Sequence, residues 1–254
     1  HMPISYLGLP LITCRLNEQL CAPLLLRLSR KIDSWTVKSL RYSGRLQLLK
    51  SVLQGIQGYW SMYLFLPKGV LKRIQSLFAK FLWGGSLDSN CIYNVAWTDC
   101  CFPKEEGGLG IRDLTEWNTA AILYQVWRLS LPSVSSLWLL WVHSCMLKRK
   151  HFWTAKIPYK CPWNLRKIFN MRSLALQYIT FKVKVGSLFN FWHDPWLTKP
   201  PLIVRFGEGI ISTMDSSANA TVGSMCSDGS WEVSLSNDYR AIAIRQLLSS
   251  VSFD

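Results

Sequence analysis

Residues 24–38 read LLLRLSRKIDSWTVK, and the spacing of their apolar and basic side chains decides the fold. The apolar residues recur every three or four positions, at Leu24, Leu28, Ile32 and Trp35. The basic residues Arg27, Lys31 and Lys38 fall on the opposite side of a helix with 3.6 residues per turn. This pattern predicts an amphipathic helix, with one face for a core and one for solvent or a ligand.

Two more helices of the same kind are expected after it. Ser43-Gly44 precedes an apolar series that runs to Ile56, with Arg45 and Lys50 on the outer side. Pro67 opens a third series, in which the outward residues are Lys72, Arg73 and Lys80. The glycines at 84 and 85 supply the stop that commonly ends a helix. Residues 13–85 are therefore predicted to form a compact bundle of three helices with a basic exterior.

The rest of the chain divides into a Trp-rich segment, residues 86–198, and a tail, residues 199–254. Helical spacing recurs at about 115–129 and 137–148. Over 179–185 apolar residues alternate with Thr180, Lys182 and Lys184, which predicts a strand that pairs with residues 188–192. Residues 1–12 are predicted to form a short strand, and the tail is expected to be acidic and loosely ordered. The predicted fold class is mainly α with a small β-hairpin.

The charge of the chain favours a polyanionic partner. The 254 residues contain 29 Lys and Arg against 15 Asp and Glu, a net charge of +14. Between Trp117 and His193 there is no acidic residue, but there are eleven Lys and Arg and six Trp. Basic and aromatic side chains together are typical of surfaces that bind nucleic acid. The alternative is a basic surface that only keeps the protein solvated.

The carboxylates are too scattered to predict a catalytic site. Metal-dependent polymerases and nucleases hold their metal ions with clustered carboxylates, yet the sequence contains no adjacent Asp pair and no Asp-x-Asp. The acidic doublet Glu105-Glu106 precedes glycines, which indicates a solvated turn. The glycines at 107, 108 and 110 lack the Gly-Lys-Ser/Thr of a phosphate loop. We therefore predict no catalytic residue and no cofactor.

The histidines and cysteines do not predict a metal site either. The spacing of His143, Cys145, His151 and Cys161 matches no standard zinc finger. His193-Asp194 has the composition of an oriented base, but no nucleophile accompanies it, so a turn with a polar cap is the preferred interpretation. Eight Cys without a Cys-x-x-Cys favour free thiols in a reducing compartment. Without a recognisable signal peptide or membrane span, the expected location is intracellular, nuclear or cytoplasmic, and not secreted.

Phosphate contacts are predicted for basic side chains that regular secondary structure holds in place. Such side chains can follow a phosphate backbone with little loss of entropy. The alternative for each one is a solvated surface cation. Trp35 and Trp60 are expected in the core, whereas Trp192 and Trp196 flank a turn and could pack or stack. The predicted nucleic-acid-binding residues are Arg27, Lys31, Lys38, Arg45, Lys50, Lys72, Arg73, Lys80, Lys182 and Lys184.

A set of short segments stands in a characteristic order along residues 3–198. It begins with ISYLGLPL at 4–11 and SGRLQLLKSVL at 43–53. It continues with FLPK at 65–68, FLWGG at 81–85, VAW at 95–97, PKEEGGLGIR at 103–112 and FWHDPWL at 191–197. Together these segments resemble the reverse transcriptases of plant LINE-type (non-LTR) retrotransposons.

The resemblance implies a thumb over residues 13–85, preceded by a strand that closes the palm and followed by a connecting segment. In this family the thumb clamps the template–primer duplex, and the catalytic aspartates lie upstream in an aromatic-x-Asp-Asp motif, which this sequence lacks. The expected activity is therefore binding of RNA or an RNA–DNA duplex without DNA synthesis, and the missing palm is a further expected partner. The zinc-binding segment and the ribonuclease H domain of some members are not recognised in the sequence.

Two alternatives stay open. The chain could be a non-binding remnant or a protein-interaction module, with exposed apolar surfaces that once packed on the palm. It could also be an enzyme of an undetected type, which the scattered carboxylates disfavour. Salt dependence separates the first alternative from phosphate binding, because apolar association does not weaken steeply with salt.

Overall fold

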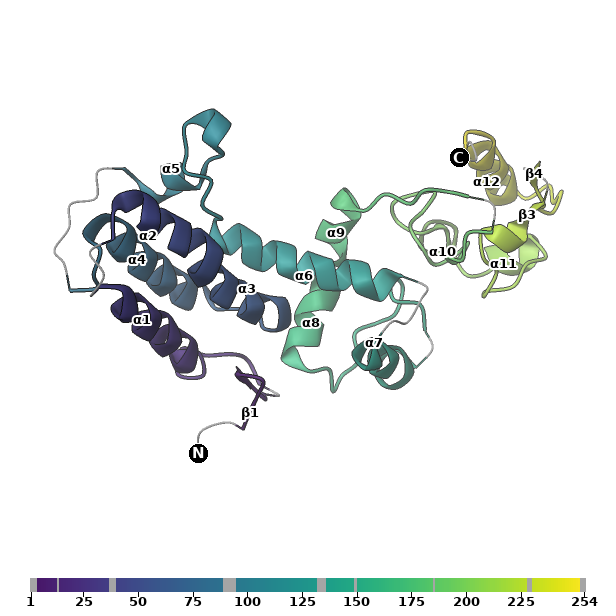
Figure 1. The fold of residues 1–254 in the computed structure, drawn as a ribbon. Coiled ribbons are helices and arrows are strands. Elements are labelled where there is room, and N and C mark those ends of the chain that lie inside the picture. Colours follow the sequence, from purple (N-terminus) through teal and green to yellow (C-terminus); the bar gives the residue numbers. More distant parts are fainter. Residues whose placement is uncertain are drawn as a thin grey trace. The chain divides into compact units, whose positions relative to one another are not determined.

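The computed structural model describes residues 4–12, 14–36, 40–88, 95–131, 136–148, 150–184, 186–227 and 230–251. Helices dominate these ranges, together with two small antiparallel hairpins, so the predicted mainly helical class is confirmed. The chain forms two compact units (Figure 1). Unit 1 comprises His1–Tyr124 and Pro162–Lys167, and unit 2 comprises Gln125–Cys161 and Ile168–Asp254.

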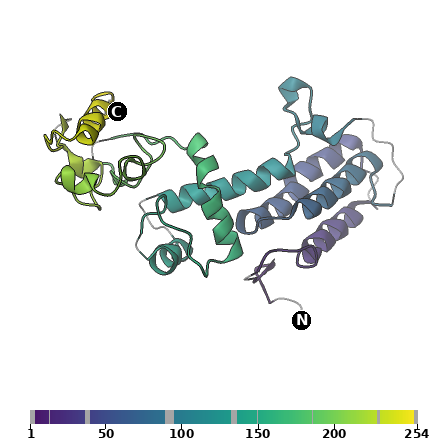
Figure 2. The same ribbon diagram turned by 180° about the vertical axis from the view of Figure 1, so that it is seen from behind.

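Three helical stretches build unit 1, as the sequence predicts. The first is α1 (Ala22–Thr36). The second runs without a break through α2 (Tyr42–Leu48), the π-helical turn η1 (Leu49–Leu53) and α3 (Gln54–Tyr63), and the third is α4 (Lys68–Gly84). Figures 1 and 2 show the three lying side by side. Their apolar faces form one core, whose fully buried side chains include Leu24, Leu28, Ile32, Leu49, Leu53, Val70, Ile74 and Phe78.

Helices α1 and α4 run in the same direction. Glu18, which precedes α1, pairs with Arg73 in the first part of α4 at 3.2 Å. Trp35 near the end of α1 packs on Phe81 near the end of α4, with ring centroids 5.6 Å apart. Gly85 ends α4 with a positive φ of 77°, a conformation that glycine adopts without steric cost.

A buried asparagine fixes the link between α3 and α4. The Asn118 side chain lies on α6 (Leu114–Ser130), where it accepts a hydrogen bond from the backbone N–H of Leu66 and donates one to the Leu66 carbonyl, both at 3.2 Å. These bonds satisfy backbone groups that would otherwise be buried without partners. The link residue Phe65 also packs on Trp163, with ring centroids 6.0 Å apart, and Lys167 Nζ lies 4.7 Å from the Phe65 ring centroid. The segment Pro162–Lys167 thereby joins unit 1.

Residues 4–12 form a hairpin instead of the single strand that the sequence predicts. Strands β1 (Ser5–Tyr6) and β2 (Leu9–Pro10) pair antiparallel, with Ser5 opposite Pro10. The turn between them places Leu7 and Gly8 at positive φ. The Tyr59 hydroxyl donates to the Leu7 carbonyl at 3.0 Å, which ties the hairpin to α3. Unit 1 also contains α5 (Trp97–Cys101) and the 3-10 turn η2 (Lys104–Glu106).

The predicted helix over 137–148 lies in unit 2, and two helices that the sequence reasoning did not find follow it along the chain, the first of them starting in unit 1. The predicted helix over 137–148 is present as α7 (Leu137–Trp141) and the π-helical turn η3 (Val142–Met146). Helices α8 (Trp163–Asn170) and α9 (Arg172–Tyr178) follow a stretch without helical spacing. They are only eight and seven residues long, too short for a repeating apolar pattern to stand out.

The hairpin predicted over 179–192 is wrong for the described residues. Residues 179–184 carry no strand, because residues 187–191 pair their backbone elsewhere. Phe191 N–H donates to the Ala220 carbonyl at 2.8 Å, and Val222 N–H donates to the Phe189 carbonyl at 3.0 Å. The bridge between Asn190 and Thr221 lies within this pairing.

Residues 202–249 fold into short elements where the sequence predicts a loosely ordered tail. They form α10 (Leu202–Phe206), α11 (Ile210–Thr213), η4 (Gly223–Met225), the hairpin of β3 (Cys226–Ser227) and β4 (Ser230–Trp231), and α12 (Tyr239–Ser249). Figure 2 shows α10, α11 and α12 gathered together. The buried apolar side chains of these elements pack on the core that contains Phe191 and Trp192, which explains the order of a segment without strong periodicity.

Candidate nucleic-acid interface

Four of the predicted phosphate-binding residues are exposed on unit 1. Arg27 and Lys31 lie on α1, and Lys72 and Arg73 lie on α4. Lys31 Nζ is 5.4 Å from the ring centroid of Trp35, so this cation rests over an indole. The ion pair of Arg73 with Glu18 is more than half exposed at both side chains, and such pairs hold little free energy. All four cations are therefore accessible to a polyanion.

Three other predicted residues are held by backbone carbonyls of unit 1. Arg45 Nη1 donates to the Trp83 carbonyl at 3.3 Å, and Lys80 Nζ donates to the Leu87 carbonyl at 3.4 Å. Lys50 Nζ donates to the Leu109 carbonyl. Burial, and next the nearby Lys104, lower the pKa of Lys50. These contacts tie α2 to the end of α4, and η1 and α4 to neighbouring loops, so the three side chains contribute to the fold.

The remaining three predicted residues are placed as follows. Lys38 lies outside the described residues. Lys182 and Lys184 are exposed in unit 2, on the extended segment 179–184. Within unit 1 the sequence reasoning left out Arg30 and Lys68, which are exposed on α1 and α4. Their position next to Lys31 and one turn before Lys72 is the signal that could have included them.

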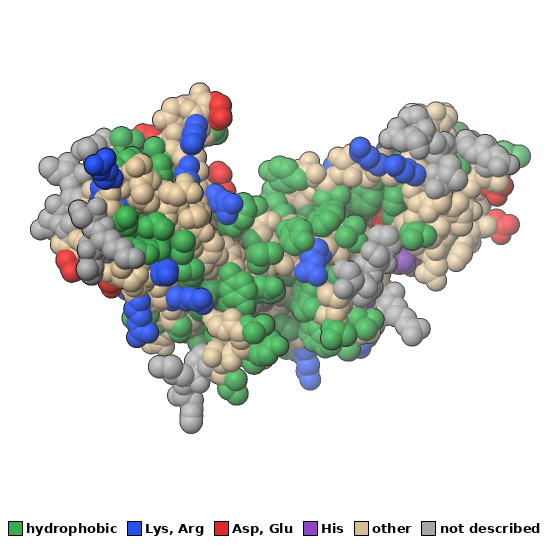
Figure 3. Space-filling view, in the orientation of Figure 1, with side chains coloured by type: hydrophobic (Ala, Val, Ile, Leu, Met, Phe, Trp, Pro, Cys, Tyr) green, Lys and Arg blue, Asp and Glu red, His purple; other side chains and the backbone are tan. Residues whose placement is uncertain are grey.

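The basic side chains of unit 1 are spread over its surface. Figure 3 shows Lys and Arg in several separate groups, with hydrophobic side chains between them. Exposed apolar side chains are concentrated at the hairpin, where Ile4 is 77% and Leu7 is 72% exposed. The surface of unit 1 thus offers both cations and apolar patches to a partner.

The glycine-rich segment 103–110 forms a turn, as the sequence predicts. Lys50 donates a hydrogen bond to the Leu109 carbonyl in this turn. Gly108 N–H donates to the Pro103 carbonyl at 2.9 Å, and Gly110 N–H donates to the Phe102 carbonyl at 2.9 Å. Gly108 lies so close to Phe102 that a Cβ atom at this position would be 2.0 Å from the Phe102 carbonyl oxygen. Only glycine fits there.

Gly108→Ala is expected to open this loop. The added methyl group clashes with backbone, so the loop has to move, and the expected loss is about 2 kcal/mol of unfolding free energy in unit 1. Urea unfolding measures this loss, and hydrogen exchange of residues 100–111 locates it. Gly55→Ala on α3 is the control for added side-chain volume in unit 1, because a Cβ atom at Gly55 would contact nothing within 4 Å and the backbone there is helical. An unchanged exchange pattern in Gly108→Ala would contradict the prediction.

The FWHDPWL segment is a turn organised by Asn190, as the polar-cap interpretation of His193-Asp194 predicts. The Asn190 side-chain oxygen accepts from the backbone N–H groups of Trp192 at 2.9 Å and His193 at 2.8 Å. Asp194 Oδ2 accepts from the backbone N–H of Asn190 at 2.7 Å. Trp192 and Trp196 are buried, so both tryptophans pack in the core of unit 2 and do not offer a stacking surface.

His151 lies against this turn, on its His193. The rings of His151 and His193 stack with centroids 4.0 Å apart, and Thr154 Oγ1 is 2.8 Å from His193 Nδ1. Burial, and next the adjacent His151, lower the pKa of His193 to about 4. Burial raises the pKa of Asp194 to about 6, against the opposing effect of its hydrogen bond from Asn190. Over the described part of the chain, no three or more His, Cys, Asp or Glu gather in a way that would hold a metal ion.

Asp194→Asn is expected to stabilise unit 2 at pH 7.5 but not at pH 4. The raised pKa means that folding favours the protonated carboxyl, so this contribution to stability is lost as the pH rises through about 6. His193 acts in the opposite direction, because its lowered pKa makes stability increase as the pH rises from about 4 to 6.5. This effect is the same in the unsubstituted chain and in Asp194→Asn, so it cancels in the comparison.

The expected gain at pH 7.5 is about 3 kcal/mol, since the pKa of Asp194 rises from 3.8 to about 6 and each pKa unit corresponds to about 1.4 kcal/mol. Urea unfolding at both pH values measures it. Asp215→Asn, at an exposed carboxylate of unit 2, should change stability equally little at both. A gain for Asp194→Asn that is the same at pH 4 and pH 7.5 would show that the charge of Asp194 is not its cause.

Comparisons with known proteins give one informative similarity. The chain is 30% identical, over 199 residues, to an Arabidopsis thaliana protein named "Putative ribonuclease H protein At1g65750". The aligned part is 77% of this chain but 32% of the Arabidopsis protein, so the chain spans about a third of that relative. No family model matches the sequence, and no solved structure matches it. Within the described ranges, no helix combines the length and the apolar character needed to cross a lipid bilayer.

Proposed function

We propose that this chain is part of a retroelement reverse transcriptase and that it binds RNA or an RNA–DNA duplex through phosphate contacts. The observation that carries the proposal is the set of exposed cations on the parallel helices α1 and α4, namely Arg27, Lys31, Lys72 and Arg73. Helices hold these side chains at fixed spacing, which favours contacts with successive phosphates. The similarity to a protein named as a ribonuclease supports a partner that contains RNA.

The proposed role is that of a thumb, which holds the duplex while another part of the protein acts on it. The order of the matching segments, from ISYLGLPL to FWHDPWL, supports this placement in the LINE-type family. The sequence contains no aromatic-x-Asp-Asp motif, so we propose that the chain does not synthesise DNA by itself. The missing palm would be its partner in the whole protein.

The test is the affinity of the full chain for a labelled RNA–DNA hybrid across a salt series. The logarithm of the association constant should fall linearly with the logarithm of the salt concentration. Four phosphate contacts correspond to a slope of about −3.6. Polyglutamate of equal charge is the control for nonspecific attraction, and it should compete weakly. A folded chain without salt-sensitive binding would overturn the proposal.

An exposed apolar patch favours a protein-interaction module as the second candidate. The patch lies on the hairpin and includes Ile4, Tyr6, Leu7 and Leu11, each more than half exposed. Tyr63 on α3 is also 57% exposed, one turn after the Tyr59 that holds the hairpin. Patches of this kind mark surfaces that another protein covers. Salt-insensitive association of the chain, seen in the same series, would favour this candidate.

A further inference from the structure

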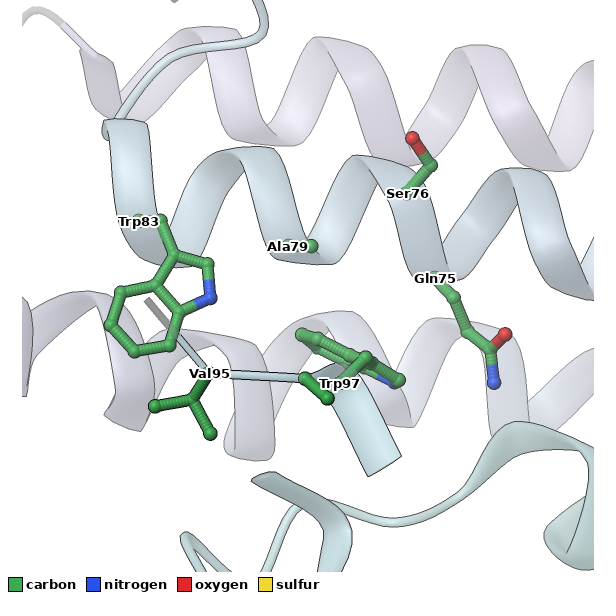
Figure 4. Close-up of a pocket in the computed structure, with 7 residues that line it drawn as sticks. Gln75, Ser76, Ala79, Trp83, Val95 and Trp97 are labelled. Atoms are coloured by element: carbon green, nitrogen blue, oxygen red, sulfur yellow. The ribbon is translucent and has the colours of Figure 1, made fainter. Parts of the chain in front are cut away.

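A pocket on the exposed side of α4 has the lining of a nucleobase site. Its volume is about 390 Å³, and its walls come from α4 and from the segment that leads into α5. In Figure 4 the Trp83 ring extends from α4 toward Val95, the Trp97 ring lies beneath Ala79, and the Gln75 amide points the same way. The lining residues are Gln75, Ser76, Ala79, Trp83, Val95, Ala96 and Trp97.

The two indole rings of the pocket are held in place before any ligand arrives. Trp83 packs on Tyr42, with ring centroids 5.5 Å apart, and its backbone carbonyl accepts a hydrogen bond from Arg45 Nη1. Trp97 packs against the core of unit 1, and its indole N–H is buried with no hydrogen-bond partner among the described residues, so Trp97 offers its ring and not its N–H. Fixed aromatic faces bind a flat base with little loss of side-chain entropy.

The polar groups at the pocket suit a base attached to a phosphate backbone. None of the lining residues is charged, and no hydrogen bond is found for the Gln75 amide in the described ranges. This amide can donate to and accept from the edge of a base. Lys72 lies on the same face of α4, four residues before Ser76 and thus about 6 Å along the helix axis. A cation at that spacing can meet the phosphate next to a bound base.

We propose that the pocket between Trp83 and Trp97 binds one unpaired nucleobase of the RNA or DNA strand that α4 holds. This inference rests on the proposed nucleic-acid binding. A paired base inside a duplex is stacked on both faces and occupied at its Watson–Crick edge, so the pocket takes a base from a single-stranded end. Stacking on aromatic side chains tolerates any base, so the site selects unpaired strands and not a sequence.

The test compares two RNA–DNA hybrids that differ only by an RNA overhang of three nucleotides. For the full chain, the overhang should raise the affinity about tenfold, as expected for stacking of one base. An abasic overhang should give no such gain. Gln75→Ala and Trp97→Leu should each reduce the gain while leaving the affinity for the blunt hybrid unchanged.

Matched variants keep this test decisive. Trp138→Leu removes an exposed tryptophan of unit 2 and should retain the full gain. Trp83→Phe keeps an aromatic ring against Tyr42 and should keep part of the gain in affinity from the overhang. Circular dichroism verifies that each variant is folded. A blunt hybrid that binds with no benefit from the overhang overturns the base site and leaves the proposed function standing. An equal gain from the abasic overhang overturns it too, and failure of all hybrids to bind overturns both proposals.

Discussion

Replacing Arg27, Lys31, Lys72 and Arg73 together by glutamate is expected to abolish binding of the RNA–DNA hybrid at physiological salt. These residues are exposed on α1 and α4, and the proposal assigns them the phosphate contacts. Losing four contacts and adding four repulsive charges should lower the affinity on the order of a thousandfold. The salt slope should shrink toward zero, because no counterions remain to be released by these side chains.

A second quadruple variant separates this effect from net charge. Lys148, Lys156, Lys160 and Lys199 are exposed in unit 2, and their replacement by glutamate changes the total charge by the same amount. That variant should keep most of the affinity and nearly the same slope. If both variants lose affinity equally, the protein attracts nucleic acid by its overall charge, and the assignment to α1 and α4 fails.

Trp192→Ala is expected to cost unit 2 about 4 kcal/mol of unfolding free energy. The Trp192 side chain is fully buried, and its ring packs edge-on against Phe191 with centroids 4.9 Å apart. Its indole N–H donates to Ser216 Oγ at 3.1 Å. Alanine removes these contacts and leaves a cavity at the centre of the core that orders residues 202–249. Urea unfolding followed by circular dichroism measures the loss.

Trp141→Ala on α7 is the matched control, since Trp141 is 41% exposed. Its expected cost is about 1 kcal/mol or less, because a surface side chain gives up little buried area. Hydrogen exchange of α10 to α12 should increase in Trp192→Ala alone. Equal costs for the two tryptophans would contradict the role of Trp192 as the organising residue of unit 2.

The helices of unit 1 were predictable because their apolar faces repeat over several turns. Leu24, Leu28 and Ile32 are each fully buried where the periodicity places them. The roles of the basic residues were harder to predict, because periodicity says which side chains point outward but not what lies beyond them. Arg45 and Lys50 both point outward from their own helix, and both meet a carbonyl of a neighbouring segment.

Unit 2 was predictable only in part, because its order depends on contacts between distant residues. The alternation over 179–185 is a true two-residue period, but the backbone partner of residues 187–191 is the segment 220–223, which has no strand pattern of its own. The short helices α10 and α11 likewise place their buried apolar residues in the core that contains Phe191 and Trp192. The base pocket beside Trp83 was equally hidden, since its walls come from segments separated along the chain.

Unit 1 is built from two separate stretches of the chain, so it is completed only late in synthesis. Phe65 acquires its aromatic neighbour only when Trp163 has left the ribosome, long after α1 to α4 have been synthesised. A nascent chain halted at Tyr124 would therefore display Phe65 to chaperones. For the same reason, a single protease cut cannot release either unit complete.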